Sequence, residues 1–384
     1  MPKASGVPSR KHLRFGVILA AVVVTGVTLT AGLWPFAFHV ENEASWSSNP
    51  HGLRFKRDST ATADSPFNGT TVCANQDGPF SLEVWLQPEK ASGYGTVMVF
   101  DSDKQPDSLA IRQSLGDIEF IRSFRGPTGK TGIRHLYIDD VFAVDQRRLL
   151  TVAVDDRETR VFVDGKRIPR IHNLGVRCAD LRGTLILGTA TSLNDTFSGT
   201  LLGLAVYGRA LDAREAADHY QAWTANPPTD LKQALNADAL YRFNEGAGRI
   251  ARNSVSDQWD ISLPDNYSVR RKRFLQPFWE EFSWDRAYAM DLAINVVGFI
   301  PMGFCMAAFL GFVVGCRRSV AIAILLCFTT SLLIEVLQAF MPLRYSGTTD
   351  LITNTCGGLL GAFLYRLVAG YLSRWRPKLE PETN

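Results

Sequence analysis

The sequence lacks the residue patterns that identify several large classes of protein. Its 384 residues carry a formal net charge of only +3, and no basic stripe of the kind that binds nucleic acid is found. There is no glycine-rich phosphate loop, no Gly-x-Ser-x-Gly nucleophile motif and no paired-histidine metal motif. We therefore expect no nucleic-acid partner, no metal site and no cofactor.

Cysteine is scarce, and the six cysteines divide between two parts of the chain. Four lie in or beside apolar runs near the C-terminus, where a thiol behaves as a small hydrophobic group: Cys305, Cys316, Cys327 and Cys356. Cys73 and Cys178 lie in the polar middle region. If that region is outside the cytoplasm, these two residues can form a disulfide. Two separately buried thiols are the alternative.

Apolar residues are not evenly spread but gather in runs near the two ends. The first run, residues 15–36, contains no charge and is long enough to cross about 30 Å of hydrocarbon. The basic segment before it also suits a cleaved signal peptide. However, the run is longer than the usual apolar part of a signal peptide, and it ends in Trp34, Pro35 and Phe36 rather than in small residues. This favours a retained transmembrane helix.

Further apolar runs near the C-terminus complete a predicted bundle of four transmembrane helices: residues 290–314, 319–341 and 350–372. Lysine and arginine concentrate on one side of these helices, in residues 1–14, in the connection after the second helix and in the tail 373–384. Such basic segments stay in the cytoplasm. We therefore expect a multi-pass protein of the cell membrane, with both termini cytoplasmic and residues 41–289 outside.

One basic cluster conflicts with that rule. Arg270, Arg271, Lys272 and Arg273 lie in the predicted outer linker, residues 266–289. Long translocated domains largely escape the charge rule, so the predicted topology is unchanged. Aromatic residues follow the cluster, which suits contact with phosphate groups of the outer leaflet. A solvated linker is the alternative interpretation.

The region between the first and second helices, residues 41–265, shows short alternating segments separated by turn residues. Residues 80–86 alternate at period two before Pro88 breaks the pattern, and Asp164 with Gly165 marks a hairpin turn. Many short strands at this spacing predict an antiparallel β-sandwich or jelly roll. One helix is expected near residues 212–223.

Several pieces of this region resemble a laminin-G-like, concanavalin A-like domain: residues 80–85, 161–166, 187–188, 197–199 and 206–211. The resemblance implies a domain that binds a glycan or a protein, in some relatives through calcium. Hydrolytic relatives carry a Glu-x-Asp-x-x-Glu strand, which this chain lacks. Because glycoside hydrolysis needs paired carboxylates, we expect no such activity. No calcium-binding loop can be recognised either.

The C-terminal helices contain polar residues that a lipid-facing helix would not retain. They are Asn295, Glu335, Gln338, Asp350 and Asn354, together with Arg344 in the last connection. Helical spacing and the predicted topology bring them to the outer membrane face. Ionisable groups at that depth indicate a binding or catalytic site, with Glu335 and Asp350 as candidate catalytic residues. Hydrogen bonds that only hold helices together are the alternative.

The same residues resemble the VanZ family. The resemblance rests on Asn295, Gly298, Pro301, Glu335, Gln338, Arg344, Asp350, Asn354 and Gly357. It implies a VanZ-like module, residues 290–372, with the sandwich inserted in its first outer loop. The family is named for a member linked to low-level glycopeptide resistance, and its biochemical activity is not established.

These features together predict an envelope membrane protein. We expect the outer domain to bind a glycan or protein, and the helix bundle, surrounded by membrane lipids, to bind an amphiphilic ligand at its outer face. A membrane-embedded enzyme acting on a lipid-linked envelope precursor is the alternative, with Glu335 or Asp350 as acid or base and Arg344 holding an anionic group. The lack of a clear inverted repeat argues against a transporter.

Overall fold

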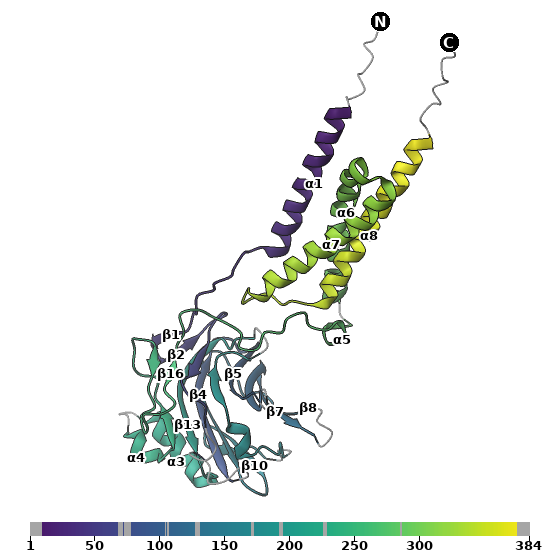
Figure 1. The fold of residues 1–384 in the computed structure, drawn as a ribbon. Helices are drawn as coiled ribbons and strands as arrows, with labels where there is room; N and C mark the ends of the chain where they lie inside the picture. The colour runs from purple at the N-terminus through teal and green to yellow at the C-terminus, as the bar shows by residue number, and fades with distance from the viewer. Residues whose placement is uncertain are drawn as a thin grey trace, which may run out of the picture. The chain divides into compact units, whose positions relative to one another are not determined.

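The computed structural model describes residues 10–374 apart from 68–71, 73–77, 104, 106, 127–130, 170–172, 192–194, 226–228 and 285. The chain divides into two compact units (Figure 1). One unit, His39–Arg271, is built from strands. The other combines Met1–Phe38 with Lys272–Asn384 and is helical.

The strand unit contains two antiparallel sheets. The first has the order β1 (Ser45–Ser48), β2 (His51–Phe55), β13 (Gly199–Tyr207), β4 (Phe80–Pro88), β9 (Arg148–Val154), β10 (Thr159–Val163) and β11 (Lys166–Arg167), with β14 (Ala239–Tyr241) also on β13. The second has the order β15 (Ile250–Ala251), β16 (Ile261–Ser262), β3 (Ala61–Ala63), β12 (Thr184–Leu187), β5 (Gly93–Asp101), β6 (Leu109–Leu115), β7 (Asp117–Arg125) and β8 (Thr131–Ile138). The predicted antiparallel sandwich is confirmed.

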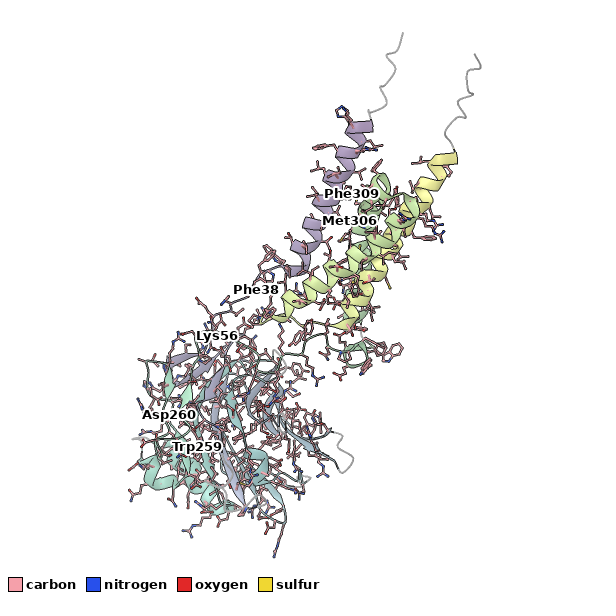
Figure 2. The ribbon with its side chains drawn as sticks, viewed as in Figure 1. Phe38, Lys56, Trp259, Asp260, Met306 and Phe309 are labelled. Atoms are coloured by element: carbon pink, nitrogen blue, oxygen red, sulfur yellow. The ribbon has the colours of Figure 1, made fainter. Side chains whose placement is uncertain are left out.

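The sandwich core follows from the alternation of its strands. In β4, Phe80, Leu82, Val84 and Leu86 are at most 1% exposed and face the space between the sheets. Aromatic residues from the loops extend this core. Trp259, labelled in Figure 2, is one of them. Its ring stacks on that of Phe67, with the ring centroids 4.6 Å apart. Side chains of this size give the unit a large hydrophobic core of its own.

The opposite face of the first sheet is covered by α3 (Ala213–Thr224), close to the predicted helix. Asp212 begins this helix, because its side chain accepts hydrogen bonds from the backbone of Arg214 and Glu215. Trp223 of α3 packs with Tyr207 of the sheet. The 3-10 helix η1 (Cys178–Leu181) and α4 (Leu231–Leu235) complete the described helices of this unit.

The cysteines follow the predicted division in part. Cys178 is fully buried and takes part in a disulfide bond. Cys73 lies outside the described residues, so the pairing of Cys73 with Cys178 stays a prediction. The four cysteines of the helical unit are free.

The helical unit contains α1 (Arg10–Leu33), α5 (Phe278–Glu281), α6 (Arg286–Val314), α7 (Cys316–Ala339) and α8 (Thr348–Arg374). Among the described residues, all of these except α5 are long and apolar enough to cross a membrane, which confirms the predicted set of four spans. Met306 and Phe309 of α6 line an apolar groove beside α1 (Figure 2).

Glycine permits the closest helix contacts in this unit. A Cβ on Gly361 of α8 would lie 2.0 Å from the carbonyl oxygen of Ile300 in α6, and one on Gly357 would lie 2.1 Å from that of Val296. Neither position can hold a side chain unless the helices move apart. Small residues of this kind allow membrane helices to pack with their backbones close together.

Candidate functional site

A cavity of about 250 Å³ lies in the helix bundle, near the end where α1 and α7 finish and α6 and α8 begin. Its polar lining comes from Thr28 and five of the six predicted residues: Asn295, Glu335, Gln338, Asp350 and Asn354. Its other lining residues are Val27, Ala31, Gly32, Ile294, Gly298, Phe299 and Ile334. The cavity therefore combines a polar region from four helices with apolar walls.

Both predicted catalytic candidates reach this cavity. Glu335 is 1% exposed, and its Oε2 atom accepts a hydrogen bond of 2.8 Å from the backbone N–H of Gly347. Asp350 accepts a hydrogen bond of 2.7 Å from the side-chain amide of Asn295. Each carboxyl group thus has a neutral hydrogen-bond partner in the bundle, and the two groups line the same space.

The side-chain amides of Gln338 and Asn354 also line the cavity, and their hydrogen bonds differ. Gln338 donates to the carbonyl oxygen of Gly32 at 2.7 Å and so joins α7 to α1. Asn354 donates to Ser331 at 3.0 Å, but its own Oδ1 atom is buried and has no partner among the described residues. Buried polar atoms are rarely left without a partner. Because Asn354 lines the cavity, a molecule bound there is a candidate partner for this acceptor.

Arg344 is the predicted site residue that does not line the cavity. Its guanidinium group donates to the carbonyl oxygen of Trp34 at 2.7 Å, just beyond the C-terminal end of α1. No ion pair with Glu335 or Asp350 is found in the described part of the chain. Cations at this end of a helix satisfy free carbonyl groups and the helix dipole.

Lys272 makes a similar contact that the sequence does not reveal. Its ammonium group donates to the carbonyl oxygens of Gln338 and Met341 at the C-terminal end of α7. Burial lowers the pKa of Lys272 to about 8. Its only sequence signal is membership of a basic cluster, which does not indicate which carbonyl groups it contacts.

The segment around α5 also contacts the start of α8. The carboxylate of Glu281 accepts a hydrogen bond of 3.2 Å from the backbone N–H of Thr349. Gln276 bonds through its backbone to Ser346 at 2.9 Å and to Thr348 at 2.8 Å. A carboxylate at this position satisfies a free N–H group and interacts favourably with the helix dipole. Sequence reasoning missed Glu281, because it precedes the predicted span.

The other basic residues of the cluster also have partners within their own units. Arg270 and Arg271 of the sandwich unit pair with Asp101, whose side chain is fully buried, at 2.9 and 2.8 Å. Arg273 of the helical unit pairs with Glu280. The hydrogen bond to Asp101 raises the pKa of Arg271 above its ordinary value, which is already high. These contacts give the cluster a structural role inside the protein.

The sandwich carries a polar row that the sequence does not predict. Arg112, Glu119 and Tyr137 lie directly opposite one another on β6, β7 and β8. Tyr137 donates to Glu119 at 2.6 Å, which raises the pKa of the tyrosine, and Arg112 pairs with Asp195 at 2.6 Å. The rings of His135 and Tyr137 lie nearly parallel, and Tyr137 is 52% exposed.

In the described ranges, no group of three or more His, Cys, Asp or Glu side chains is arranged to hold a metal ion. That the protein works without calcium or another cofactor stays a prediction.

Comparison with known families gives a match for each part of the chain. The VanZ/LLP1 family model matches residues 241–369, and the model of the concanavalin A-like lectin/glucanases superfamily matches residues 58–217. The first match begins within the sandwich unit and includes α6, α7 and most of α8. No curated protein sequence matches the chain.

Among solved structures, similar chains include a native heptameric SAP-like pentraxin from Limulus polyphemus, with 10% identity and a TM-score of 0.36, covering 61% of this chain and 98% of its own. A proposed carbohydrate binding protein from Bacteroides ovatus ATCC 8483 has 10% identity and a TM-score of 0.39, covering 59% of each chain. The binding domain of botulinum neurotoxin DC, solved with rat synaptotagmin II, has 10% identity and a TM-score of 0.36, covering 48% of this chain and 46% of its own.

The antiparallel sandwich and the long apolar helices define the class of this protein, a membrane protein with a lectin-like domain. More specifically, it has a membrane region that matches the VanZ/LLP1 family model over residues 241–369, and the domain that matches the concanavalin A-like model over residues 58–217 stands between the first and second candidate spans.

Proposed function

We propose that this protein is a multi-pass envelope protein whose sandwich binds a glycan or protein outside the cytoplasm and whose bundle binds an amphiphilic molecule. The observation that carries the bundle's role is the cavity lined by Asn295, Glu335, Gln338, Asp350 and Asn354 together with apolar walls. Its volume of about 250 Å³ suits the polar end of an amphiphile and the first part of its chain. The unpartnered Oδ1 atom of Asn354 would accept a hydrogen bond from the head group.

A membrane-embedded enzyme is the second candidate, and one observation favours it. Glu335 and Asp350 line the same cavity, as an acid and a base acting on one substrate would. The polar end of a lipid-linked precursor would then enter between them. Turnover of such a precursor by the purified protein, lost in Glu335→Gln, would favour this candidate over simple binding.

Filling the cavity tests the binding role directly. Gly298 lines the cavity, and a Cβ at this position would meet no atom within 4 Å. We therefore expect Gly298→Leu to keep the bundle folded but to abolish binding of dihexanoyl phosphatidylglycerol, followed by native mass spectrometry of the detergent-purified protein. Glu335→Gln should also abolish binding with little change in melting temperature.

Two controls separate ligand binding from packing. Gly298→Ala adds a single methyl group and should retain most of the binding. Arg344→Gln lies outside the cavity lining, so it should bind the probe normally while lowering stability by about 0.3–1 kcal/mol. Normal binding by Gly298→Leu and Glu335→Gln would leave the polar residues as helix contacts only, in which case Glu335→Ala should lower stability by about 1 kcal/mol.

The proposed orientation has its own test. Single cysteines at Lys166, an exposed position of the sandwich, and at Tyr345 should react with an impermeant maleimide added to intact cells. A cysteine at Arg376, outside the described residues, should react only after the membrane is opened. Labelling of position 376 in intact cells would contradict cytoplasmic termini.

The resistance linked to the family's namesake provides a cellular test. If the bundle retains that role, expression should raise the inhibitory concentration of a lipid-bearing glycopeptide, and Gly298→Leu should cancel the increase. An equal increase with the wild type and with Gly298→Leu would show that resistance does not depend on the cavity.

A further inference from the structure

A second cavity, of about 710 Å³, lies within the sandwich unit and is rich in arginine. Arg122 and Arg134 stand directly opposite each other on β7 and β8. Like charges placed opposite each other across a strand pair are destabilising. Such a pair needs a compensating negative charge, and among the described residues only Arg122 has one.

Arg122 is buried and held in place by Asp180. Its Nε atom donates to the Oδ2 atom of Asp180 at 2.7 Å, and Asp180 also accepts hydrogen bonds from the backbone of Arg177 and the side chain of Gln105. This arrangement fixes the plane of the Arg122 guanidinium group. A guanidinium held through Nε can present its Nη atoms to an oxyanion.

Arg134, in contrast, is exposed and forms no hydrogen bond or ion pair with any described residue. Its guanidinium lies over the ring of Phe124 at 5.2 Å from the centroid, and that of Arg122 lies 5.7 Å from the same centroid. Phe124 pairs with Gly132, where a Cβ would lie 2.6 Å from the ring. Glycine at this position therefore makes room for the ring that supports both arginines.

The two guanidinium groups converge at Gly175. A Cβ on this residue would lie 2.8 Å from the Nη1 atom of Arg134 and 3.2 Å from that of Arg122. Gly175 has a φ of +65°, a conformation that glycine adopts without strain. Two positively charged groups thus approach one point of the cavity lining. That geometry suits an anion that accepts hydrogen bonds from both.

The rest of the cavity suits a sugar rather than an anion alone. Its lining includes Gln105, Asn173, Asp155 and Asp156, which offer hydrogen-bond donors and acceptors to hydroxyl groups. Its volume is within the range of about 300–1,000 Å³ that is usual for small-molecule sites. We propose that the sandwich binds an acidic saccharide, with its carboxylate or phosphate group between Arg122 and Arg134. This proposal rests on, and narrows, the proposed glycan-binding function.

Binding by the full-length protein in detergent tests the proposal. The probes are tetragalacturonic acid, glucose 1-phosphate, neutral maltotetraose and inorganic phosphate, measured by calorimetry at low and moderate salt. At least one acidic saccharide should bind more tightly than maltotetraose and inorganic phosphate, and the binding should weaken with salt. Preference for one of the two acidic saccharides identifies carboxylate or phosphate as the recognised group.

Arg134 provides the decisive variant, because it forms no hydrogen bond or ion pair with a described residue that its replacement would break. Arg134→Gln should lower the affinity for the acidic saccharide about tenfold or more, which is the loss expected for a charge-assisted contact. Its melting temperature should not change. Arg134→Lys should fall between this variant and the wild type. The control Arg214→Gln removes an exposed arginine of α3, outside the cavity lining, and should bind normally.

Four results would overturn the proposal. Equal binding of the acidic saccharide by Arg134→Gln and the wild type would rule out the proposed site. Equal affinity for inorganic phosphate and the acidic saccharides would leave an anion site without a role for the sugar. Binding of maltotetraose alone would leave the glycan-binding function intact but reject the acidic ligand, whereas failure of every saccharide would count against both.

Discussion

Two buried polar groups, one in each unit of this protein, differ in how fully their hydrogen bonds are satisfied. In the sandwich, the fully buried carboxylate of Glu83 accepts hydrogen bonds from Tyr207 and Trp223 at 2.6 and 3.1 Å and contacts His219 at 3.0 Å and Thr151 at 3.3 Å. In the bundle, the cavity lining includes an amide oxygen with no partner in the described residues. A fully satisfied group holds a structure together, whereas the unsatisfied amide oxygen of Asn354 is one of the features on which the proposed ligand site rests.

The units also differ in how their backbones approach each other. The sandwich fills its interior with large side chains such as Phe80 and Phe120. The bundle brings α6 and α8 together at Gly357 and Gly361. Water drives apolar side chains together in the first case, but lipid offers no such drive to the second. Close backbone contact is therefore a large part of what holds the membrane helices together.

The largest effect is expected from Glu83→Ala. The substitution leaves His219, Tyr207, Trp223 and Thr151 buried without their shared acceptor. Breaking a buried pair of this kind lowers the free energy of unfolding by about 3–5 kcal/mol. Denaturant unfolding of the sandwich, followed by its tryptophan fluorescence in the full-length protein, measures the change.

The matched control for this prediction is Glu158→Ala. Glu158 pairs with Arg167 at 2.8 Å, but both side chains are close to half exposed. Pairs of this kind contribute about 0–1 kcal/mol. If the two variants lose similar stability, the buried hydrogen bonds of Glu83 stabilise the sandwich no more than an exposed ion pair does.

Glycine-to-alanine substitutions test the packing of the bundle. Gly361→Ala places a methyl group against the carbonyl oxygen of Ile300, so we expect a loss of about 1–3 kcal/mol. Gly370→Ala adds the same group where no atom lies within 4 Å, and should be neutral or stabilising by up to about 1 kcal/mol. Thermal unfolding in detergent compares the two variants. Equal melting temperatures would mean that close contact between α6 and α8 is dispensable.

Much of the fold could be predicted from the sequence, because the long apolar runs and the alternation of apolar and polar residues are both strong patterns. Uncharged runs predict the spans, and alternation predicts most strands, including β4. Nothing comparable predicts β8, because only Leu136 and Ile138 of this strand reach the core cluster. Edge strands with mostly exposed side chains lack the alternation on which such a prediction depends.

The candidate site could be predicted only where helical spacing applies. Glu335 and Gln338 share a helix face, and so do Asp350 and Asn354, so their meeting at one cavity follows from the helices. Arg344 lies in a connection without periodicity, and its partner is a main-chain carbonyl oxygen. Lys272 contacts α7 through main-chain groups as well. Contacts with distant backbone atoms have no side-chain signature in the sequence.

The smallest expected effect concerns Lys272, which is half-buried at the end of α7 and therefore partly screened by water. Its pKa of about 8 in the folded protein lies below the value of about 10.4 expected in the unfolded chain. Below pH 8 both states are protonated. Between about pH 8 and 10.4 the folded state binds fewer protons, so stability rises with pH.

Comparison with Lys272→Met isolates this contribution, because methionine keeps the apolar stem and removes the titrating group. The neutral amine still has two N–H donors, enough for the carbonyl oxygens of Gln338 and Met341. The melting temperature of the wild type should therefore rise relative to that of Lys272→Met as the pH increases from 8 to 10, in the same detergent. Parallel curves over this range would mean that Lys272 titrates as it does in water, and that the end of α7 is as open to solvent as the surface of the sandwich.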